Sequence, residues 1–326
     1  METRRLGRSD LTVSVVGLGC NNLGRPGALT FEQEGTDAVI HAALNAGVTF
    51  FDTADVYGAE YGLSETRLGV ALKGVRGEAV IATKFGHSGM GSGLEEVGAK
   101  GSRAYIRAAV EGSLRRLDTD HIDLYQMHTP DPATPIAETL AALDELVTEG
   151  KVRAIGNSNF DAAQLRDADA AATGLGTARF VSAQNHYSLL ARDAELEVLP
   201  AVEELGMGFL PYFPLANGLF TGKFSRTEIP ADTRIGRQRP EVHESAPWDE
   251  IEAYVAFARE RGVDILGATF GWLLSKPYLS SVIAGATRPE QIRANAIAGD
   301  AWRPTPADLD EVDSFFEPPA APIDES

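Results

Sequence analysis

The chain has 326 residues, of which 44% are hydrophobic and 23% are charged, proportions that are ordinary for a globular protein. Acidic residues outnumber basic ones by 47 to 29, and the formal charge of −18 argues against nucleic acid or anionic membranes as partners, although a locally basic pocket could still hold an anionic cofactor. A single cysteine, Cys20, excludes an intrachain disulfide, and the sequence shows neither a signal peptide nor the roughly 18 consecutive apolar residues of a membrane span, so we expect a cytoplasmic protein.

The first predicted element is a hairpin. Residues 2–14 alternate weakly between apolar and polar side chains on either side of residues 7–10, which have turn-forming character. This pattern predicts an N-terminal β-hairpin that precedes the main sheet.

After the hairpin, a short apolar run followed by an amphipathic helix recurs along the chain. The runs begin near Val15, Val48, Ala79, Ile122, Val152, Phe180, Met207 and Ser281. Up to Met207 the starts are about 27 to 43 residues apart, which is the period of a strand–helix unit. Alternating buried strands and helices predict a parallel sheet, and eight repeats favour an α/β fold of the (β/α)8 TIM barrel type over an open doubly wound sheet.

Two of the predicted helices have recognisable ends. Ser102 is placed to start one helix, and Thr134 is expected to cap the next, with Pro135 at its first position. Gly150 stands where that second helix should end, because a C-terminal cap often needs a left-handed residue.

Three segments interrupt the repeat, but none reads as a linker, so residues 1–326 are expected to form a single barrel domain. Residues 215–248 form a long loop rich in Gly, Pro and Arg, and such a loop after a barrel strand is usually functional or mobile. The glycine-rich residues 86–101 are either a lid or a surface excursion. A short acidic tail, about residues 315–326, would give the substrate little cover.

Polar residues follow the ends of the apolar runs. They are Asp52 and Tyr57, Thr83 and Lys84, His128, Asn157 to Asn159, Gln184 and Asn185, Tyr212, and residues 285–288. Because the carboxyl ends of all strands of a (β/α)8 barrel lie at one rim, these side chains are expected to converge there.

Asp52, Tyr57, Lys84 and His128 suit proton transfer to a carbonyl group. A free phenol has a pKa near 10, and a neighbouring lysine ammonium is expected to lower that of Tyr57. Asp52 would keep Lys84 charged, and His128 could orient a carbonyl oxygen by a hydrogen bond. Taken alone, each has a structural alternative: a buried ion pair, a loop packing residue, a strand-end cap. Their occurrence together at neighbouring strand ends favours catalysis.

At these positions the sequence resembles the aldo-keto reductase superfamily, and more closely its bacterial and channel-associated branches than the aldose reductases. The resemblance covers residues from about 4 to 298 and rests on the order and spacing of several segments. They are residues 50–58, 64–65, 82–86, 126–128, 152–160, 184–188, 214–215, 218–223 and 285–295.

The resemblance implies an NADPH-dependent oxidoreductase that reduces aldehydes or ketones. Tyr57 would be the general acid, Lys84 and Asp52 the pair that tunes it, and His128 the group that orients the carbonyl. Ser158, Asn159 and Gln184 would hold the nicotinamide carboxamide while Tyr212 stacks on the ring, which fixes the face that delivers hydride. The other implied cofactor contacts are Cys20, Asn21, Phe213, Leu215, Lys223, Gly285, Thr287, Arg288, Gln291 and Asn295.

The same resemblance favours NADP(H) over NAD(H). Arg288 and the Thr287 hydroxyl would suit a 2′-phosphate, although Arg288 could also be a solvated arginine at a helix start. Phe213, Thr287 and Gly285 depart from residues that are common in the family. Phe213 stands where a serine is common, Thr287 where a basic residue is frequent, and Gly285 where some branches have a lysine.

Two other classes of function stay open on the sequence. One is a cofactor-bound redox sensor or accessory subunit with slow turnover. The other is a metal-dependent lyase or isomerase, which would need several Asp, Glu or His ligands at the rim. Only Asp52 and His128 qualify, and Lys84 between them would oppose a cation, so no metal is expected.

The substrate is expected to be a small carbonyl compound. We expect the protein neither to bind nucleic acid nor to insert into a membrane. Its identity would depend on the loops after Cys20, Phe85, His128 and Tyr212. Each of three phenylalanines, Phe85, Phe213 and Phe220, either lines the substrate pocket or belongs to the core. The sequence leaves the oligomeric state open.

Overall fold

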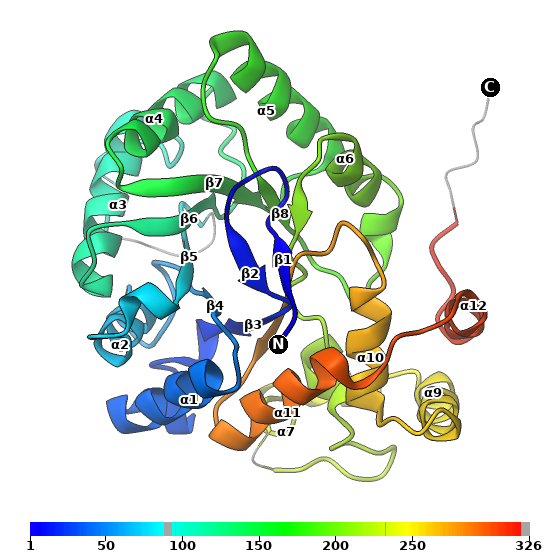
Figure 1. The fold of residues 1–326 in the computed structure, drawn as a ribbon. Helices are drawn as coiled ribbons and strands as arrows, with labels where there is room; N and C mark the ends of the chain where they lie inside the picture. The colour runs from blue at the N-terminus through cyan, green and yellow to red at the C-terminus, as the bar shows by residue number, and fades with distance from the viewer. Residues whose placement is uncertain (88–92, 95, 232, 321–326) are drawn as a thin grey trace, which may run out of the picture.

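The computed structural model describes residues 1–87, 93–94, 96–231 and 233–320. Eight parallel strands follow one another in the order β10-β3-β4-β5-β6-β7-β8-β9 and curl into a barrel surrounded by helices (Figure 1). Phe209 joins the first and last strands, because its amide donates to Tyr278 O at 2.8 Å and its carbonyl accepts from Ser280 N at 3.0 Å. The predicted (β/α)8 barrel is confirmed.

The strands lie close to the predicted runs. They are β3 (Val16–Gly19), β4 (Phe50–Asp52), β5 (Val80–Phe85), β6 (Ile122–Met127), β7 (Val152–Ser158), β8 (Ser182–Gln184), β9 (Gly208–Phe209) and β10 (Val282–Gly285).

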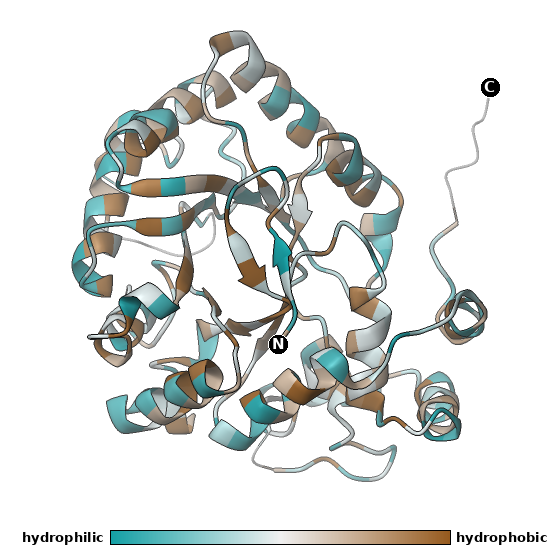
Figure 2. Cartoon of the chain, viewed as in Figure 1, coloured by the Kyte–Doolittle hydropathy of each residue, from teal (hydrophilic) through white to brown (hydrophobic). Residues whose placement is uncertain are grey.

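Helices connect successive strands and pack around the barrel. They are α1 (Gln33–Asn45), α2 (Leu63–Ala71), α3 (Arg103–Leu117), α4 (Ile136–Thr148), α5 (Ala162–Leu175), α6 (Val198–Glu204), α10 (Ile265–Leu274) and α11 (Pro289–Ala301). Two further helices, α9 (Trp248–Glu260) and α12 (Pro306–Phe315), pack against each other beside α10. Figure 2 shows the hydrophobic residues along the strands and on helix faces turned toward them.

The predicted hairpin covers the N-terminal end of the barrel. Strands β1 (Thr3–Arg5) and β2 (Thr12–Ser14) pair antiparallel. Gly7 lies in their turn at φ +53°, where a Cβ would come within 2.2 Å of Val181 O, so the turn requires glycine. Leu6 and Leu11 of the hairpin pack against inward-facing residues of the strands. The hairpin therefore closes the end of the barrel opposite the rim where polar side chains gather.

The alternation of side chains along the strands positions that polar rim. Phe50, Ala82 and Leu124 form a buried layer inside the barrel. Since successive side chains of a strand point to opposite faces, residues two positions further along each strand also point inward, one layer nearer the carboxyl ends. Those residues are Asp52, Lys84 and Gln126.

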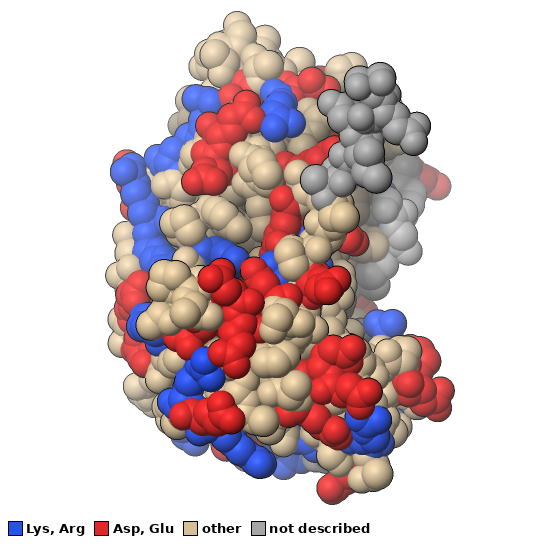
Figure 3. Space-filling model, turned by 90° about the vertical axis from the view of Figure 1, so that its right-hand side faces the viewer, with Lys and Arg blue, Asp and Glu red and all other residues tan. Residues whose placement is uncertain are grey.

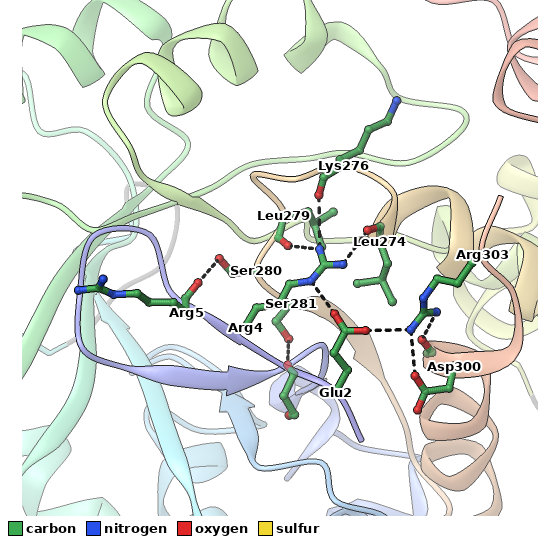
Figure 4. Close-up of polar contacts among 12 residues, drawn as sticks. Glu2, Arg4, Arg5, Leu274, Lys276, Leu279, Ser280, Ser281, Asp300 and Arg303 are labelled. Atoms are coloured by element: carbon green, nitrogen blue, oxygen red, sulfur yellow. Dashed lines mark hydrogen bonds and ion pairs between the residues drawn. The ribbon is translucent and has the colours of Figure 1, made fainter. Parts of the chain in front are cut away.

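Arg4 of the hairpin ties β1 to the end of α10 (Figure 4). Its guanidinium donates to Leu274 O and to Leu279 O, each at 2.8 Å, and to Lys276 O at 3.4 Å. These carbonyls lie at or beyond the last turn of α10, where a helix leaves its acceptors unpaired and favours a positive charge.

Arg4→Met is therefore expected to destabilise the fold by about 2 kcal/mol, because it removes charge-assisted hydrogen bonds to carbonyls that are partly buried. The measurement is the shift of the urea unfolding midpoint. Arg5→Met is the matched control, since Arg5 is exposed and bonds only within its own hairpin or to Ser280 through its backbone. Equal shifts for the two variants would contradict the role given to Arg4.

Several local predictions are corrected or confirmed. Ser102 does cap α3, since its hydroxyl accepts from Tyr105 N at 3.3 Å. Thr134 does not cap α4: its hydroxyl donates to Asp131 at 2.8 Å, and Pro135 is the N-cap residue, one position before the helix begins. Gly150 follows the end of α4 in the expected left-handed conformation, at φ +75°.

The three irregular segments also differ in part from expectation. Residues 215–248 contain the 3₁₀ segment η5 (Ala216–Thr221) and the short helices α7 (Arg234–Gln238) and α8 (Pro240–Glu244). The C-terminal tail starts later than predicted, because Phe315 ends α12 and Phe316 packs edge-on against Phe220 and Tyr254. Of the glycine-rich segment and the tail, residues 88–92, 95 and 321–326 lie outside the described residues.

Candidate active site

Four elements bring the predicted catalytic side chains together at the carboxyl rim. Asp52 is the last residue of β4, Lys84 lies near the end of β5, and His128 directly follows β6. The register places Asp52 beside Ala82 and Lys84 beside Gln126. Tyr57 lies in the segment between β4 and α2. The structure therefore brings these four side chains together at one rim.

Lys84 and Asp52 form a buried ion pair inside the barrel. The Lys84 Nζ lies 2.7 Å from Asp52 Oδ2 and also donates to Thr53 O at 2.8 Å. Lys84 is fully buried. Burial by itself would lower the pKa of this ammonium, but the charges of Asp52 and Tyr57 outweigh it, and the pKa is raised above its usual value. The Lys84 side chain is therefore a cation at neutral pH.

The second oxygen of Asp52, Oδ1, accepts two hydrogen bonds. Gln126 Nε2 and Gln184 Nε2 donate to Asp52 Oδ1 at 3.2 and 3.0 Å. Sequence reasoning missed Gln126 as a site residue, although its inward position two residues before His128 was a usable signal. It also gave Gln184 only a cofactor contact, whereas its amide nitrogen here fixes Asp52.

Tyr57 lies directly over this ion pair. The Lys84 Nζ is 5.1 Å from the centre of the Tyr57 ring. Burial raises the pKa of the phenol above its usual value, and the Lys84 ammonium, which acts in the opposite direction, offsets only part of that effect. The sequence-based expectation of a lowered pKa is therefore wrong, because it neglected burial. At neutral pH the phenol is protonated and can act as a proton donor.

His128 faces Tyr57 across the site. The two rings lie 5.8 Å apart and nearly perpendicular, at 83°. Burial, and then the charge of Lys84, hold the pKa of the imidazole well below its usual range, so the ring is neutral. Its backbone carbonyl accepts from Asn159 Nδ2 at 2.9 Å, which ties this residue to the neighbouring strand end. A neutral imidazole can donate one hydrogen bond to an oxygen between the two rings.

A second buried network supports the segment that carries Tyr57. Tyr61 donates to Asp55 Oδ2 at 2.7 Å. Buried Glu65 accepts from Thr83 Oγ1 at 2.5 Å and from Arg116 Nε at 2.7 Å. Burial raises the pKa of Asp55 to about 7. These contacts hold the segment between β4 and α2 against β5 and α3, and so limit the movement of Tyr57.

The residues implied for the nicotinamide also lie together. Ser158 Oγ donates to Gln184 O at 2.8 Å, and Asn159 Nδ2 lies 3.1 Å from Ser158 Oγ. Tyr212 OH donates to Asn159 Oδ1 at 3.0 Å. Asn159 has a left-handed backbone at φ +61°, a conformation that asparagine tolerates better than most residues. The Tyr212 ring is parallel to that of His186, with centres 5.4 Å apart.

The backbone after Tyr212 turns back on itself. Phe213, Ala216 and Asn217 all have positive φ, at +53°, +46° and +59°. Such strained turns cluster at ligand sites. Leu215 is nearly buried, whereas Lys223 is exposed. Phe85 and Phe220 belong to the core, so neither lines a substrate pocket.

The residues implied for the adenosine gather where β10 meets α11. Thr287 N and Oγ1 lie 2.7 and 3.2 Å from Gln291 Oε1, so these two residues hold each other. Arg288 is the N-cap residue of α11. Asn295 is 5% exposed and its Nδ2 has no hydrogen-bond partner among the described residues. A buried amide donor without an acceptor indicates a place for one to bind.

Cys20 and Asn21 follow β3 at the same rim. The Cys20 side chain is fully buried and its thiol donates to Leu18 O, so a ligand contact of Cys20 would involve its backbone. Asn21 is partly exposed.

Neither a metal centre nor a membrane span emerges from the described parts of the chain. In them, no three His, Cys, Asp or Glu side chains gather as metal ligands. No helix within those ranges is both long and apolar enough to cross a bilayer. At the rim, the Asp52 carboxylate pairs with the ammonium group of Lys84, so it is not arranged as a ligand of a metal ion.

The comparisons with known proteins agree with this geometry. The family model described as "Aldo/keto reductase family" matches residues 15–317. A Bacillus subtilis (strain 168) protein named "Uncharacterized oxidoreductase YrpG" is 37% identical over 301 residues, covering 90% of this chain and 89% of its own. A rice (Oryza sativa subsp. japonica) protein named "Probable voltage-gated potassium channel subunit beta" is 33% identical over 313 residues, 92% of each chain. "Probable aldo-keto reductase 1" of Glycine max is 40% identical over 235 residues, 71% of this chain and 64% of its own.

Proposed function

The chain belongs to the aldo/keto reductase family, and on that premise we propose that it reduces aldehydes or ketones to alcohols with NADPH, with Tyr57 as the proton donor. Membership makes the protein an oxidoreductase whose relatives use a nicotinamide cofactor. The observation that supports the finer proposal is the buried Lys84–Asp52 pair, whose ammonium lies 5.1 Å from the centre of the Tyr57 ring, while the neutral His128 ring faces Tyr57.

Each residue would have one task in the reaction. The Tyr57 hydroxyl gives its proton to the carbonyl oxygen, and the Lys84 ammonium stabilises the phenolate that is left. Asp52 holds Lys84 in place, and Gln126 and Gln184 hold Asp52. Neutral His128 donates a hydrogen bond to the same carbonyl oxygen and orients it. A bound reduced nicotinamide would supply the hydride.

The residues fit a dinucleotide along the rim. Ser158, Asn159 and Gln184 offer amide and hydroxyl groups for the nicotinamide carboxamide, and Tyr212 offers a ring to stack on. At the other end, the unpartnered Asn295 amide and the start of α11 suit the adenosine. Leu215 and Lys223 would lie between the two ends. We propose NADPH over NADH because Arg288 and Thr287 suit a 2′-phosphate.

The proposal is tested by turnover of 4-nitrobenzaldehyde with NADPH or NADH, followed by the absorbance of the reduced nicotinamide. We expect turnover with both cofactors and a lower KM for NADPH. Arg288→Gln is expected to raise the KM for NADPH about tenfold or more, because it removes a charge-assisted contact to the 2′-phosphate, and to change the KM for NADH much less. Equal changes for both cofactors would contradict the NADP assignment.

A second candidate function is a cofactor-binding accessory subunit with slow turnover. The name of the rice relative, a channel beta subunit, favours it. The two proposals differ in the rate of product release: a pre-steady-state burst of NADPH oxidation followed by very slow steady-state turnover would favour the accessory subunit. Steady turnover without a burst would favour the reductase.

A further inference from the structure

Arg25 lies at the rim beside the segment that carries Tyr57. Two hydrogen bonds fix the chain on either side of Gly24: its amide donates to Thr30 O, and its carbonyl accepts from Ala59 N, both at 2.8 Å. Arg25 is the next residue, and its own amide and carbonyl are held in turns, with Asn22 O at 3.2 Å and with Ala28 N at 3.2 Å. Because Ala59 is two residues after Tyr57, these bonds hold Arg25 close to the proposed proton donor.

The side chain of Arg25 is half-buried without a carboxylate. In the described ranges its one side-chain hydrogen bond is a long one, from Nη1 to Asn22 Oδ1 at 3.4 Å. No described acidic group lies within ion-pair distance of it. Burial lowers its pKa from the usual value, and the negative charge that Tyr57 carries when it is ionised acts in the opposite direction, so the two side chains influence each other.

Most other partly buried arginines in the described ranges pair with an acid, and Arg67 is an exception, because its Nη1 donates to Gln33 Oε1 at 3.3 Å and it forms no ion pair within those ranges. Arg76 pairs with Asp123 at 2.7 Å, Arg116 with Glu65 at 2.7 Å, and Arg192 with Asp313 at 2.6 Å. A desolvated cation without an anion costs free energy, which is why such groups are normally paired. Arg25 departs from that pattern beside the segment that carries Tyr57.

Two lysines also lie near the site. Lys84 is buried beneath Tyr57, and its negative partner Asp52 is fully bonded. On the other side, Lys100 lines a cavity of about 350 Å³ together with Asp131 and with Thr129, the residue after His128. Burial lowers the pKa of His128 and of His87, and the charge of Lys100 acts in the same direction. The surface elsewhere has an excess of acid, and many acidic side chains cover the face shown in Figure 3. A guanidinium without an acidic partner can still attract an anion in a protein of negative net charge, because the field of distant charges is screened.

We propose that Arg25 binds an anionic group, a carboxylate or a phosphate monoester, on the carbonyl substrate. A guanidinium can bind either group through two parallel hydrogen bonds. The proposal rests on the proposed reductase function, and it assigns the substrate class that the reductase reaction alone leaves open: small aldehydes or ketones that carry a negative charge away from the carbonyl.

A substrate anion is favoured over a cofactor phosphate by the position of Arg25. Its loop is bonded to Ala59, on the Tyr57 side of the rim. The residues proposed for the pyrophosphate and the adenosine belong to the segments after β9 and β10. Of this loop, Asn22 and Gly27 approach those segments: Asn22 Nδ2 would lie 3.0 Å from a Cβ at Gly285, and Gly27 O accepts from Arg237 Nη1 at 2.7 Å.

The experiment compares three benzaldehydes that differ only in the para group: 4-formylbenzoate, 4-formylphenyl phosphate and neutral methyl 4-formylbenzoate. For each, kcat/KM is measured with saturating NADPH in the wild type, Arg25→Met and Arg25→Lys. We expect Arg25→Met to lower the ratio of kcat/KM for one of the two anions to kcat/KM for the ester by about tenfold or more, and Arg25→Lys to lower it less. The anion that responds identifies the group. Arg237→Met is the matched control, because Arg237 is exposed and donates to Gly27 O of the same loop.

A binding measurement keeps the proposal testable if no aldehyde is reduced. The affinity of 4-(hydroxymethyl)benzoate and of 4-(hydroxymethyl)phenyl phosphate for the NADP⁺-saturated protein is measured by calorimetry. We expect about tenfold weaker binding of one of them to Arg25→Met than to the wild type. An unchanged anion-to-ester ratio together with unchanged affinities would overturn the proposal, and so would a weakened NADPH affinity in Arg25→Met with an unchanged ratio, which would assign Arg25 to the cofactor.

Discussion

Tyr57→Phe is expected to lower kcat for aldehyde reduction by about 10²- to 10⁴-fold, the range that a general acid contributes. The substitution removes one hydroxyl and leaves the ring, which is packed between Lys84 and His128. NADPH affinity should change little, because the proposed cofactor contacts come from other strand ends. The measurements are steady-state oxidation of NADPH with 4-nitrobenzaldehyde and cofactor binding by quenching of protein fluorescence.

Tyr61→Phe is the matched control for this prediction. Tyr61 lies four residues further along the same segment and also loses one hydroxyl, but that hydroxyl donates to Asp55. It should lose far less activity than Tyr57→Phe. Similar losses in both variants would mean that the segment is disturbed and that Tyr57 has no special role as a donor.

Lys84→Met is expected to abolish most of the activity and to cost about 3–5 kcal/mol of stability, because it leaves the Asp52 carboxylate buried without its cation. Asp52 would keep the amide donors of Gln126 and Gln184, but these carry no net charge. The phenolate of Tyr57 would also lose the ammonium that stabilises it. Urea unfolding and the same turnover assay measure the two effects.

The double variant Lys84→Met, Asp52→Asn separates stability from catalysis. Removing both charges leaves no buried ion without a partner, so most of the lost stability should return. Activity should not return, because no cation lies beneath Tyr57. Recovery of turnover along with stability would show that Lys84 acts only through the fold.

The barrel could be predicted from the sequence because its strand–helix unit repeats along the chain and each unit is recognisable within a short stretch of sequence. Strand runs such as Ile122–Met127 recur with helices between them, and the eight-fold repeat excludes most other arrangements. The hairpin was predicted in the same way from its alternation and turn. Thr134 shows the limit of that reasoning: a cap depends on which partner a hydroxyl binds, and the Thr134 hydroxyl donates to Asp131.

The rim residues could be located from the sequence because each ends a strand run, and Asp52, Lys84 and His128 follow directly from that position. The pKa values of these residues could not be predicted in the same way. The raised pKa of the Tyr57 phenol depends on how deeply the folded chain buries it, and Gln126 became a site residue only through its register beside Lys84. Arg25 gave no sequence signal, since its lack of an acidic partner is a property of the fold.

The loop after Tyr212 was recognised as unusual from its composition, but its short helices were not foreseen. Helices α7 and α8 have five residues each, too few for a periodic pattern to reveal. The packing of Phe316 on Phe220 likewise joins segments far apart in the sequence.

The central claim is that this site transfers a hydride from a reduced nicotinamide to a carbonyl carbon on one fixed face of the ring. The most direct test uses NADPH carrying deuterium at C4 of the nicotinamide, prepared as each of its two stereoisomers, with 4-nitrobenzaldehyde as the acceptor. Mass spectrometry of the isolated 4-nitrobenzyl alcohol should find deuterium on the carbinol carbon with one isomer and none with the other. Alcohol without deuterium from either isomer, or an equal label from both, would contradict the account.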